Sequence, residues 1–445
     1  MMVLRIRPGG LLLAALLIAG STFAVAALGA RADGPMVAAP AVLDLAVPAD
    51  PDGLAARIGV WSAKVAADEH DYISATNLGI LYLGRARLTG DLADYERSAA
   101  AVERALAADP EYLAARTLEA VVRYATHDFG GALEAASDVL ADAPGQLDAL
   151  AVVGDASLEL GRPDAAGTTY ARLTELAPGP AVDVRRARLA LLSGDLGGAV
   201  DLARDARDGA IAEGLSDMAF YEIQLGEFGR LTGDAGLARR GFEAALALRP
   251  GDRAALVGLA RVRAFEGDLG AAEALLRRAA EIAPEPATVA LLGQVLALRG
   301  DAAGAAEQAE LVRLTARLSE LAGAVYDREL LLFELDHGAV SEELLARARS
   351  AAAARPDVAG RDIVAWALRR LGRSDEAWAV AEAALPTGAG DARLLYHAGA
   401  IAAARGDVTR ATDLLGAALA LGPALDPLQR RAAVDLLRPM TSPGS

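Results

Sequence analysis

The chain has 445 residues, no cysteine and a formal net charge of −16 at pH 7. The absence of cysteine excludes disulfides, zinc ribbons and the lipobox of a lipoprotein. An acidic chain in which Lys64 is the only lysine argues against nucleic acid or anionic lipid as the main partner, because both carry negative charge.

Residues 1–32 have the composition of a targeting segment. Arg5 and Arg7 form a positive start, residues 8–30 carry no charge, and the small residues around Ala32 offer a cleavage site. A secretory signal has an apolar run of about 7–15 residues and a spanning helix needs about 20. We expect either a signal peptide cleaved near Ala32 or a retained N-terminal transmembrane anchor. Both put the rest of the chain outside the cytoplasm, anchored or secreted, and only residues 8–30 would contact a membrane.

A linker over residues 33–51, rich in Pro, Gly and Ala, precedes an expected flanking helix over residues 52–70. The apolar residues of this helix recur at helical spacing on one stripe. They are Leu54, Ile58, Trp61 and Val65.

The run Asp68-Glu69-His70-Asp71 brings carboxylates and an imidazole together in four consecutive residues. Such a group could coordinate a cation or move a proton. Adjacent residues on a helix point in different directions, however, and Asp is a preferred helix cap. We interpret the run as a polar junction in which Asp71 caps the next helix, and keep a metal or catalytic site near His70 as the alternative.

Residues 71–424 repeat with a period near 34, which is typical of stacked helical units. Each unit has a central turn, and most units close with a proline. The glycine of the turn can end one helix in a left-handed conformation, the Asp after it can cap the next helix, and the proline ends the unit. The turns are Gly90-Asp91, His127-Asp128, Gly161-Arg162, Gly194-Asp195, Gly233-Asp234, Gly267-Asp268, Gly300-Asp301, His337-Gly338, Gly372-Arg373 and Gly406-Asp407.

Two positions in the repeat hold small residues, which predicts close approach of helices. Most units have an alanine five residues after the first residue of the turn, as at Ala166, Ala238, Ala272 and Ala411. The first helix of several units has a glycine directly after an apolar residue, at Gly79, Gly154, Gly226, Gly293 and Gly399. With the aromatic, alanine and proline of Phe242, Ala245 and Pro250, these offsets resemble the tetratricopeptide repeat family over residues 70–424. Several secreted bacterial tetratricopeptide proteins of unassigned function are also similar, in residues 336–338 and 396–399.

The resemblance implies an all-α, right-handed superhelical solenoid of about ten helix pairs with flanking helices. It also implies that ligands lie along the concave face, which the first helix of each pair lines. Projected onto that face, the chain offers a groove for a peptide with acidic residues or a free C-terminus, since arginine binds carboxylates. The groove residues are Arg188, Arg230, Arg261, Trp366, Arg369, Arg393 and Tyr396. The alternative is that these arginines pair with acidic residues of adjacent helices.

Residues 425–445 complete the expected organisation as a capping helix and tail, because Asp426-Pro427 is a helix start signal. The chain has no Gly-rich phosphate loop with a lysine, no G-x-S-x-G and no H-E-x-x-H. We therefore predict a non-enzymatic extracytoplasmic scaffold for a protein or peptide partner, without cofactor or metal. It would serve envelope assembly or hold a partner. The alternatives are an enzyme or metal-dependent protein near His70, and a self-assembling structural protein.

Overall fold

The computed structural model describes residues 51–89, 91, 93–321, 328–387 and 390–441, and all regular structure in these residues is helical. This confirms the expected all-α class for the described part of the chain. The predicted targeting segment, residues 1–32, and the predicted linker up to residue 50 lie outside the described residues. Within the ranges given above, no helix has both the length and the apolar character to cross a membrane.

The helices follow one another along the chain with short connections. The first helices of the pairs are α2 (Tyr72–Thr89), α4 (Leu113–Ala125), α6 (Leu147–Glu159), α8 (Pro180–Leu192), α10 (Met218–Leu231), α12 (Arg253–Glu266), α14 (Pro286–Leu298), α16 (Arg328–His337), α18 (Val358–Arg370) and α20 (Ala392–Ala404). The second helices are α3 (Ala93–Ala108), α5 (Phe129–Asp142), α7 (Pro163–Leu176), α9 (Leu196–Glu213), α11 (Ala235–Leu248), α13 (Leu269–Ile282), α15 (Ala302–Leu321), α17 (Glu342–Ala354), α19 (Ser374–Ala384) and α21 (Val408–Ala420). The remaining elements are α1 (Pro51–Ala67), α22 (Pro427–Thr441) and two 3-10 helices, η1 (Leu385–Thr387) and η2 (Gly422–Ala424).

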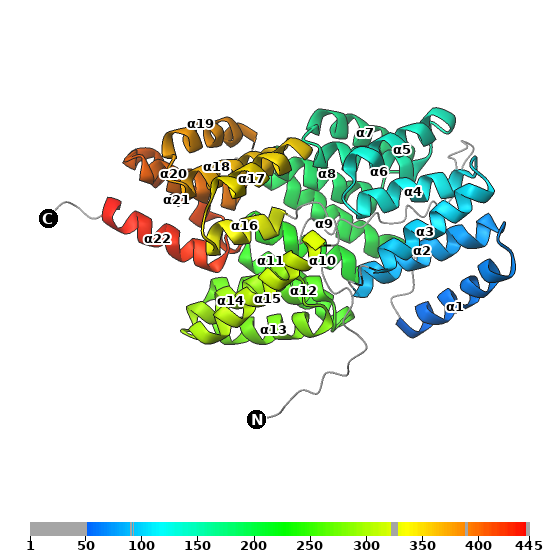
Figure 1. Cartoon of the computed structure of the whole chain (residues 1–445), viewed down its shortest axis with the longest axis horizontal. Helices are drawn as coiled ribbons and strands as arrows, with labels where there is room; N and C mark the ends of the chain where they lie inside the picture. The colour runs from blue at the N-terminus through cyan, green and yellow to red at the C-terminus, as the bar shows by residue number, and fades with distance from the viewer. Residues whose placement is uncertain (1–50, 90, 92, 322–327, 388–389, 442–445) are drawn as a thin grey trace, which may run out of the picture.

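Ten helix pairs, α2–α3 to α20–α21, stack in chain order, with α1 before them and α22 after them (Figure 1). Each pair packs on the next, so the apolar core is a series of clusters along the array. The expected α-solenoid is therefore confirmed for the described residues.

The turns within the pairs have the predicted chemistry. Gly233 and Gly267 have φ values of 89° and 88°, and five other turn glycines are also left-handed, a conformation that costs glycine little. The Asp268 carboxylate accepts a hydrogen bond from the Ala271 amide at 3.0 Å, which caps α13. The backbone of Gly338 is not left-handed. α16 ends one residue before it and α17 begins only at Glu342, so a longer connection replaces the tight turn of other pairs.

The predicted small residues lie where helices approach closely. A methyl group added at Gly154 would lie 2.4 Å from the Tyr170 ring, and one added at Gly399 would lie 2.7 Å from Leu415. Gly258, which the repeat pattern did not single out, is as crowded, because its methyl group would lie 2.3 Å from Phe242. These contacts leave no room for a larger side chain.

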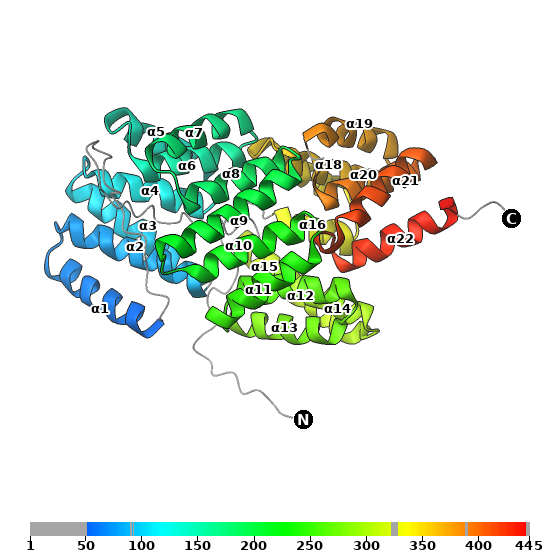
Figure 2. The same ribbon diagram turned by 180° about the vertical axis from the view of Figure 1, so that it is seen from behind.

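The array folds back on itself. In Figures 1 and 2, the C-terminal helices α16–α22 lie against first helices of earlier pairs, among them α6 and α12. Most buried apolar residues of α16–α22 form one cluster drawn from residues 331–433, whereas Leu330 and Phe333 of α16 pack with Val289 and Val312 of the preceding pair. Among the described side chains packed on that cluster, Leu196 is the one from the N-terminal half. The C-terminal helices therefore have a core of their own.

Candidate protein-interaction surface

Six successive helix pairs, α4–α5 to α14–α15, contact the C-terminal helices along one line, which we call the seam. Its N-terminal side consists of residues of the first helices, of the turns after them and of the starts of two second helices: Phe129, Glu159, Gly161, Leu191, Leu196, Arg230, Gly233, Arg261, Phe265 and Gln294. Its C-terminal side consists of the connections that follow the second helices and of the start of α22: Arg355, Pro356, Asp357, Gly390, residues 420–424, Asp426 and Arg430. Pro356, Gly390 and Ala424 are spaced at the repeat period, so the contacts recur about once per repeat.

Glu159 forms the most buried ionic contact of the seam. It is the last residue of α6, is 5% exposed, and accepts hydrogen bonds from the guanidinium groups of Arg188 and Arg355. Arg188 comes from the neighbouring first helix, whereas Arg355 is 196 residues away along the chain. Burial alone would raise the pKa of Glu159, but the two positive charges outweigh burial and lower this pKa to about 2.

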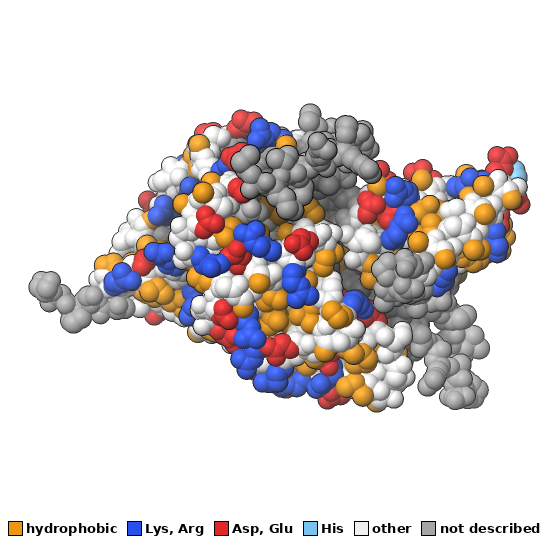
Figure 3. Space-filling model, turned by 90° about the horizontal axis from the view of Figure 1, so that it is seen from below, with side chains coloured by type: hydrophobic (Ala, Val, Ile, Leu, Met, Phe, Trp, Pro, Cys, Tyr) orange, Lys and Arg blue, Asp and Glu red, His pale blue; other side chains and the backbone are white. Residues whose placement is uncertain are grey.

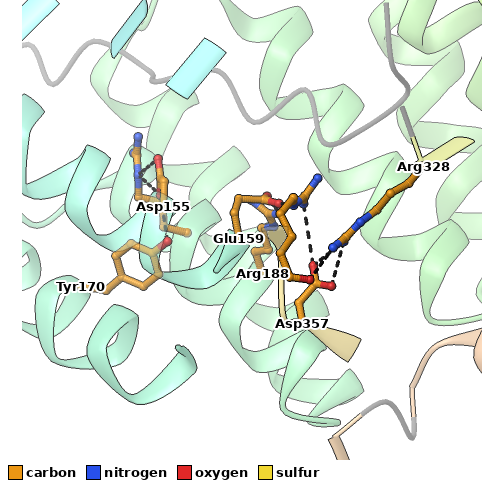
Figure 4. Close-up of polar contacts among 8 residues, drawn as sticks. Asp155, Glu159, Tyr170, Arg188, Arg328 and Asp357 are labelled. Carbon is orange, nitrogen blue, oxygen red and sulfur yellow. Dashed lines mark hydrogen bonds and ion pairs between the residues drawn. The ribbon is translucent and has the colours of Figure 1, made fainter. Parts of the chain in front are cut away.

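The connection that carries Arg355 is held by Asp357 and Arg328, which Figure 4 shows beside Glu159 and Arg188. Arg328 donates to both carboxylate oxygens of Asp357, at 2.8 and 2.7 Å. Asp357 also caps α18 by accepting from the Gly360 amide at 2.8 Å. The Arg355 guanidinium lies over the ring of Phe129, 4.6 Å from its centroid. These contacts position Arg355 toward Glu159.

Two further arginines bind the segment before α22. The Arg230 guanidinium donates to the backbone carbonyls of Pro423 and Ala424, at 3.3 and 3.4 Å. Arg261 forms an ion pair with Asp426. Burial would raise the pKa of Asp426, but the positive charge of Arg261, supported by two other arginines, lowers it. A row of first-helix arginines thus binds a carboxylate and backbone carbonyls, which are the groups of an acidic peptide.

Apolar contacts across the seam are few. The Phe265 ring lies against Gly422, where an added methyl group would be 3.2 Å away, and the Arg430 guanidinium stacks on the same ring at 4.5 Å. A methyl group at Gly390 would lie 2.9 Å from Leu196. The seam is therefore held mainly by ionic and hydrogen-bonding contacts.

Behind the seam, Asp155 organises a buried polar cluster within the N-terminal half (Figure 4). The Tyr170 hydroxyl donates to the Asp155 carboxylate at 2.8 Å, and Arg185 donates to it at 3.0 Å. Burial first, and then the negative charge of Asp155, raises the pKa of Tyr170 well above its usual value. Tyr170 is also the ring that closes on Gly154, so this cluster supports the close helix contact.

The predicted groove residues fall into two groups. Arg188, Arg230 and Arg261 lie on the first helices α8, α10 and α12, and each has an acidic partner of this chain: Glu159, Glu227 or Asp426. Glu159 lies on the adjacent first helix, as the alternative interpretation expected, whereas Glu227 lies on the same helix as Arg230 and Asp426 belongs to the far end of the chain. A role of these arginines in binding a separate peptide stays a prediction.

The second group lies inside the C-terminal core. The rings of Trp366 and Tyr396 have centroids 5.9 Å apart, and both side chains are 7% exposed. The Trp366 indole donates to Asp336 at 2.7 Å and stacks on His397 at 4.1 Å. Two arginines surround this group. They are Arg369, which donates to the Ala400 carbonyl at 3.4 Å, and Arg393, which lies 3.6 Å from Asp362.

The polar run near His70 lies at the junction between α1 and α2. The side chains of Glu69 and His70 are about four-fifths exposed, and Nε2 of His70 lies 3.8 Å from Oε1 of Glu69. Asp71 accepts a hydrogen bond from the Ser74 amide at 2.8 Å, so its role as a helix cap is confirmed. In the described ranges no group of His, Asp and Glu side chains has the arrangement to hold a metal ion.

Sequence reasoning missed the C-terminal side of the seam. Arg355, Asp357 and Asp426 lie in connections between helix pairs, and no local pattern distinguishes them from other polar connection residues. Asp426 was noted only as a helix start. One signal in the sequence could have pointed to this side of the seam. The row of first-helix arginines needs acidic partners, and in an acidic chain these partners can come from distant segments.

Fold and site together define an all-helical solenoid of tetratricopeptide-like helix pairs, closed on itself by a polar seam. No family model and no curated protein matches the chain.

Among solved structures, the chain is similar to PilW, a widely conserved type IV pilus biogenesis factor, with 19% identity and a TM-score of 0.39, over 46% of this chain and 93% of PilW. A thermophilic tetratricopeptide protein of Thermus thermophilus has 20% identity and a TM-score of 0.38, over 43% of this chain and 98% of its own. A tetratricopeptide repeat protein of Parabacteroides merdae has 14% identity and a TM-score of 0.40, over 56% of this chain and 98% of its own. The resemblance to the family rests on the turns, caps and close helix contacts of this chain.

Proposed function

We propose that this chain is a non-enzymatic, extracytoplasmic scaffold that binds a protein partner, in envelope assembly or in holding that partner. The first-helix surface with Arg230 and Arg261 is the proposed binding surface. One observation carries the proposal: these arginines already bind the carbonyls and the carboxylate of residues 423–426. The same donors suit an acidic segment of another protein.

The charge distribution supports a protein partner. Figure 3 shows Lys and Arg side chains interspersed with Asp and Glu side chains over one face, with apolar side chains among them. A nucleic-acid site needs a mainly basic surface, whereas acidic and basic side chains are mixed on this face. A mixed polar and apolar surface is usual for protein–protein contacts.

The extracytoplasmic location is supported by the amino acids of residues 1–32 alone. Fusion of residues 1–51 to a reporter enzyme that folds only outside the cytoplasm tests it. An active reporter supports export, and N-terminal sequencing of the mature protein distinguishes cleavage near Ala32 from a retained anchor. An inactive reporter, with the fusion protein present in the cells, contradicts this part of the proposal.

Partner capture from the native envelope fraction tests the binding surface. We would compare the wild type with an Arg230→Gln/Arg261→Gln variant. The matched control is Arg240→Gln/Arg431→Gln, which removes two exposed guanidinium groups outside the seam. Far-UV circular dichroism establishes that all three are folded. We expect a partner that is retained by the wild type and the control and lost by the seam variant. Equal capture by all three moves the site to another surface.

A further inference from the structure

The seam shows the proposed binding surface already occupied by the chain itself. Arg261 and its partner Asp426 are 165 residues apart in the sequence, and Arg230 reaches carbonyls 193 and 194 residues away. Residues 423–426 present two carbonyls, from the end of η2, followed by a carboxylate, and an acidic peptide offers the same groups. The segment therefore lies on the arginine row as an intramolecular ligand.

The packing of α22 shows that this ligand is separable from the rest of the fold. Ala433, Leu436 and Leu437 of α22 belong to the C-terminal core or pack against it. Across the seam, by contrast, the segment is held by ionic contacts, by the Phe265 ring and by hydrogen bonds, one of them from the Leu428 amide to Gln294 of α14 at 3.5 Å. Separation at the seam would thus break polar contacts that water or a partner can replace, and would leave the core cluster of α16–α22 intact.

We propose that residues 420–430 are an autoinhibitory ligand of the arginine row, and that an acidic segment of a partner protein displaces them. This inference rests on the proposed function, because it concerns the same surface. The inference adds two points: residues 420–430 cover the arginine row in the chain without its partner, and binding of the partner opens the seam. Two copies of the chain could also exchange these residues, and the tests below detect that exchange as a dimer.

Attachment to the same chain gives residues 420–430 an advantage over a free peptide. A tethered ligand has an effective concentration on the order of millimolar. A free peptide with the same contacts must therefore compete poorly with the closed wild type. It must bind well once the attached copy is disabled, and this difference is the signature of an autoinhibitory contact.

The cysteine-free sequence allows the opening to be measured directly. Arg240→Cys on α11 and Arg431→Cys on α22 place two spin labels at exposed positions on opposite sides of the seam. We expect one short distance in the labelled wild type and a shift of most molecules to longer distances in Asp426→Arg. Arg261→Glu, which repels Asp426 from the other side, must give the same shift. The combined charge swap, Arg261→Glu/Asp426→Arg, must restore the short distance, whereas Asp435→Arg, an equal charge change on α22 outside the seam, must leave it unchanged.

A peptide of residues 420–438 is the probe for the binding surface. We expect the Asp426→Arg variant to bind this peptide at least about tenfold more tightly than the closed wild type does, given the competition described above. A peptide with Arg in place of Asp426 must not bind the Asp426→Arg variant. Sedimentation of each variant shows whether a second copy supplies the segment instead.

The outcomes separate this inference from the proposed function. An unchanged distance in both single variants, with helix content retained, overturns the autoinhibitory closure and leaves the proposed partner binding standing. A seam that opens without any gain in peptide affinity also overturns it. Loss of helix content in one single variant leaves the other variant and the charge swap to decide. Failure to capture an envelope partner, with the peptide behaving as expected, counts against the proposed function alone.

Discussion

Replacement of Glu159 by Gln tests the buried ionic contact of the seam most directly. Gln has nearly the shape of Glu but cannot balance the charges of Arg188 and Arg355, which both donate to the wild-type carboxylate. The pKa of Glu159 is lowered from 4.5 to about 2. At 1.36 kcal/mol per pH unit, this corresponds to about 3 kcal/mol of stabilisation of the ionised form. Removal of one partner of a buried ion pair costs about 3–5 kcal/mol, so we expect a loss of about 3 kcal/mol in the free energy of unfolding at pH 7.

The pH dependence of this loss has a definite sign. Because the pKa of Glu159 is lower in the folded chain than in the unfolded chain, its contribution is complete above pH 4.5. It disappears as the pH falls toward 2, where the wild-type carboxyl group becomes protonated. The difference between the wild type and Glu159→Gln must therefore be largest at neutral pH and shrink below pH 4.5.

Urea unfolding followed by circular dichroism from pH 3 to pH 7 measures this difference. Hydrogen exchange at pH 7 localises it to α6 and α8, which is needed because repeat arrays can unfold in segments. The matched control is Glu382→Gln, which breaks a surface ion pair with Arg410 whose side chains are both 52% exposed. Such a pair contributes about 0–1 kcal/mol. The reasoning is refuted if Glu159→Gln costs no more than Glu382→Gln, or if its cost is the same at pH 3 as at pH 7.

Three further substitutions test the repeat geometry by urea unfolding. Gly258→Ala should lower the free energy of unfolding by about 1–3 kcal/mol, because the added methyl group would collide with Phe242. The control is Gly416→Ala, also in a helix, where the added methyl group would meet no neighbouring side chain or helix within 4 Å, so this change should be neutral or stabilising. Equal effects of the two substitutions would contradict the close contact at Gly258. Tyr170→Phe should cost about 1–3 kcal/mol because the buried Asp155 carboxylate loses a hydrogen bond, and a neutral result would show that this bond contributes nothing. Asp268→Ala should lower the free energy of unfolding by about 1 kcal/mol, because α13 loses its cap. The control Asp413→Ala, at an exposed position inside α21, should lower it by less than about 0.5 kcal/mol. A larger loss for Asp413→Ala than for Asp268→Ala would contradict the role of the cap.

The amino-acid sequence alone determined the local architecture. Left-handed glycines at Gly233 and Gly267, the cap at Asp268 and the close contacts of Gly154 and Gly399 depend on residues within about one repeat of each other. Such features follow from backbone sterics and short-range hydrogen bonds, so a 34-residue pattern predicts them. The sequence also singled out Arg188, Arg230 and Arg261 as residues of one surface.

Only the tertiary structure decided what those arginines contact. Glu159 meets Arg355, and Arg261 meets Asp426, across 196 and 165 residues. Whether such distant turns touch depends on the curvature of the solenoid, which accumulates small rotations from each repeat. The second helices also differ in length, with 18 residues in α9 and 20 residues in α15. No local pattern encodes an accumulated rotation, and for this physical reason the seam could be found only in the folded chain.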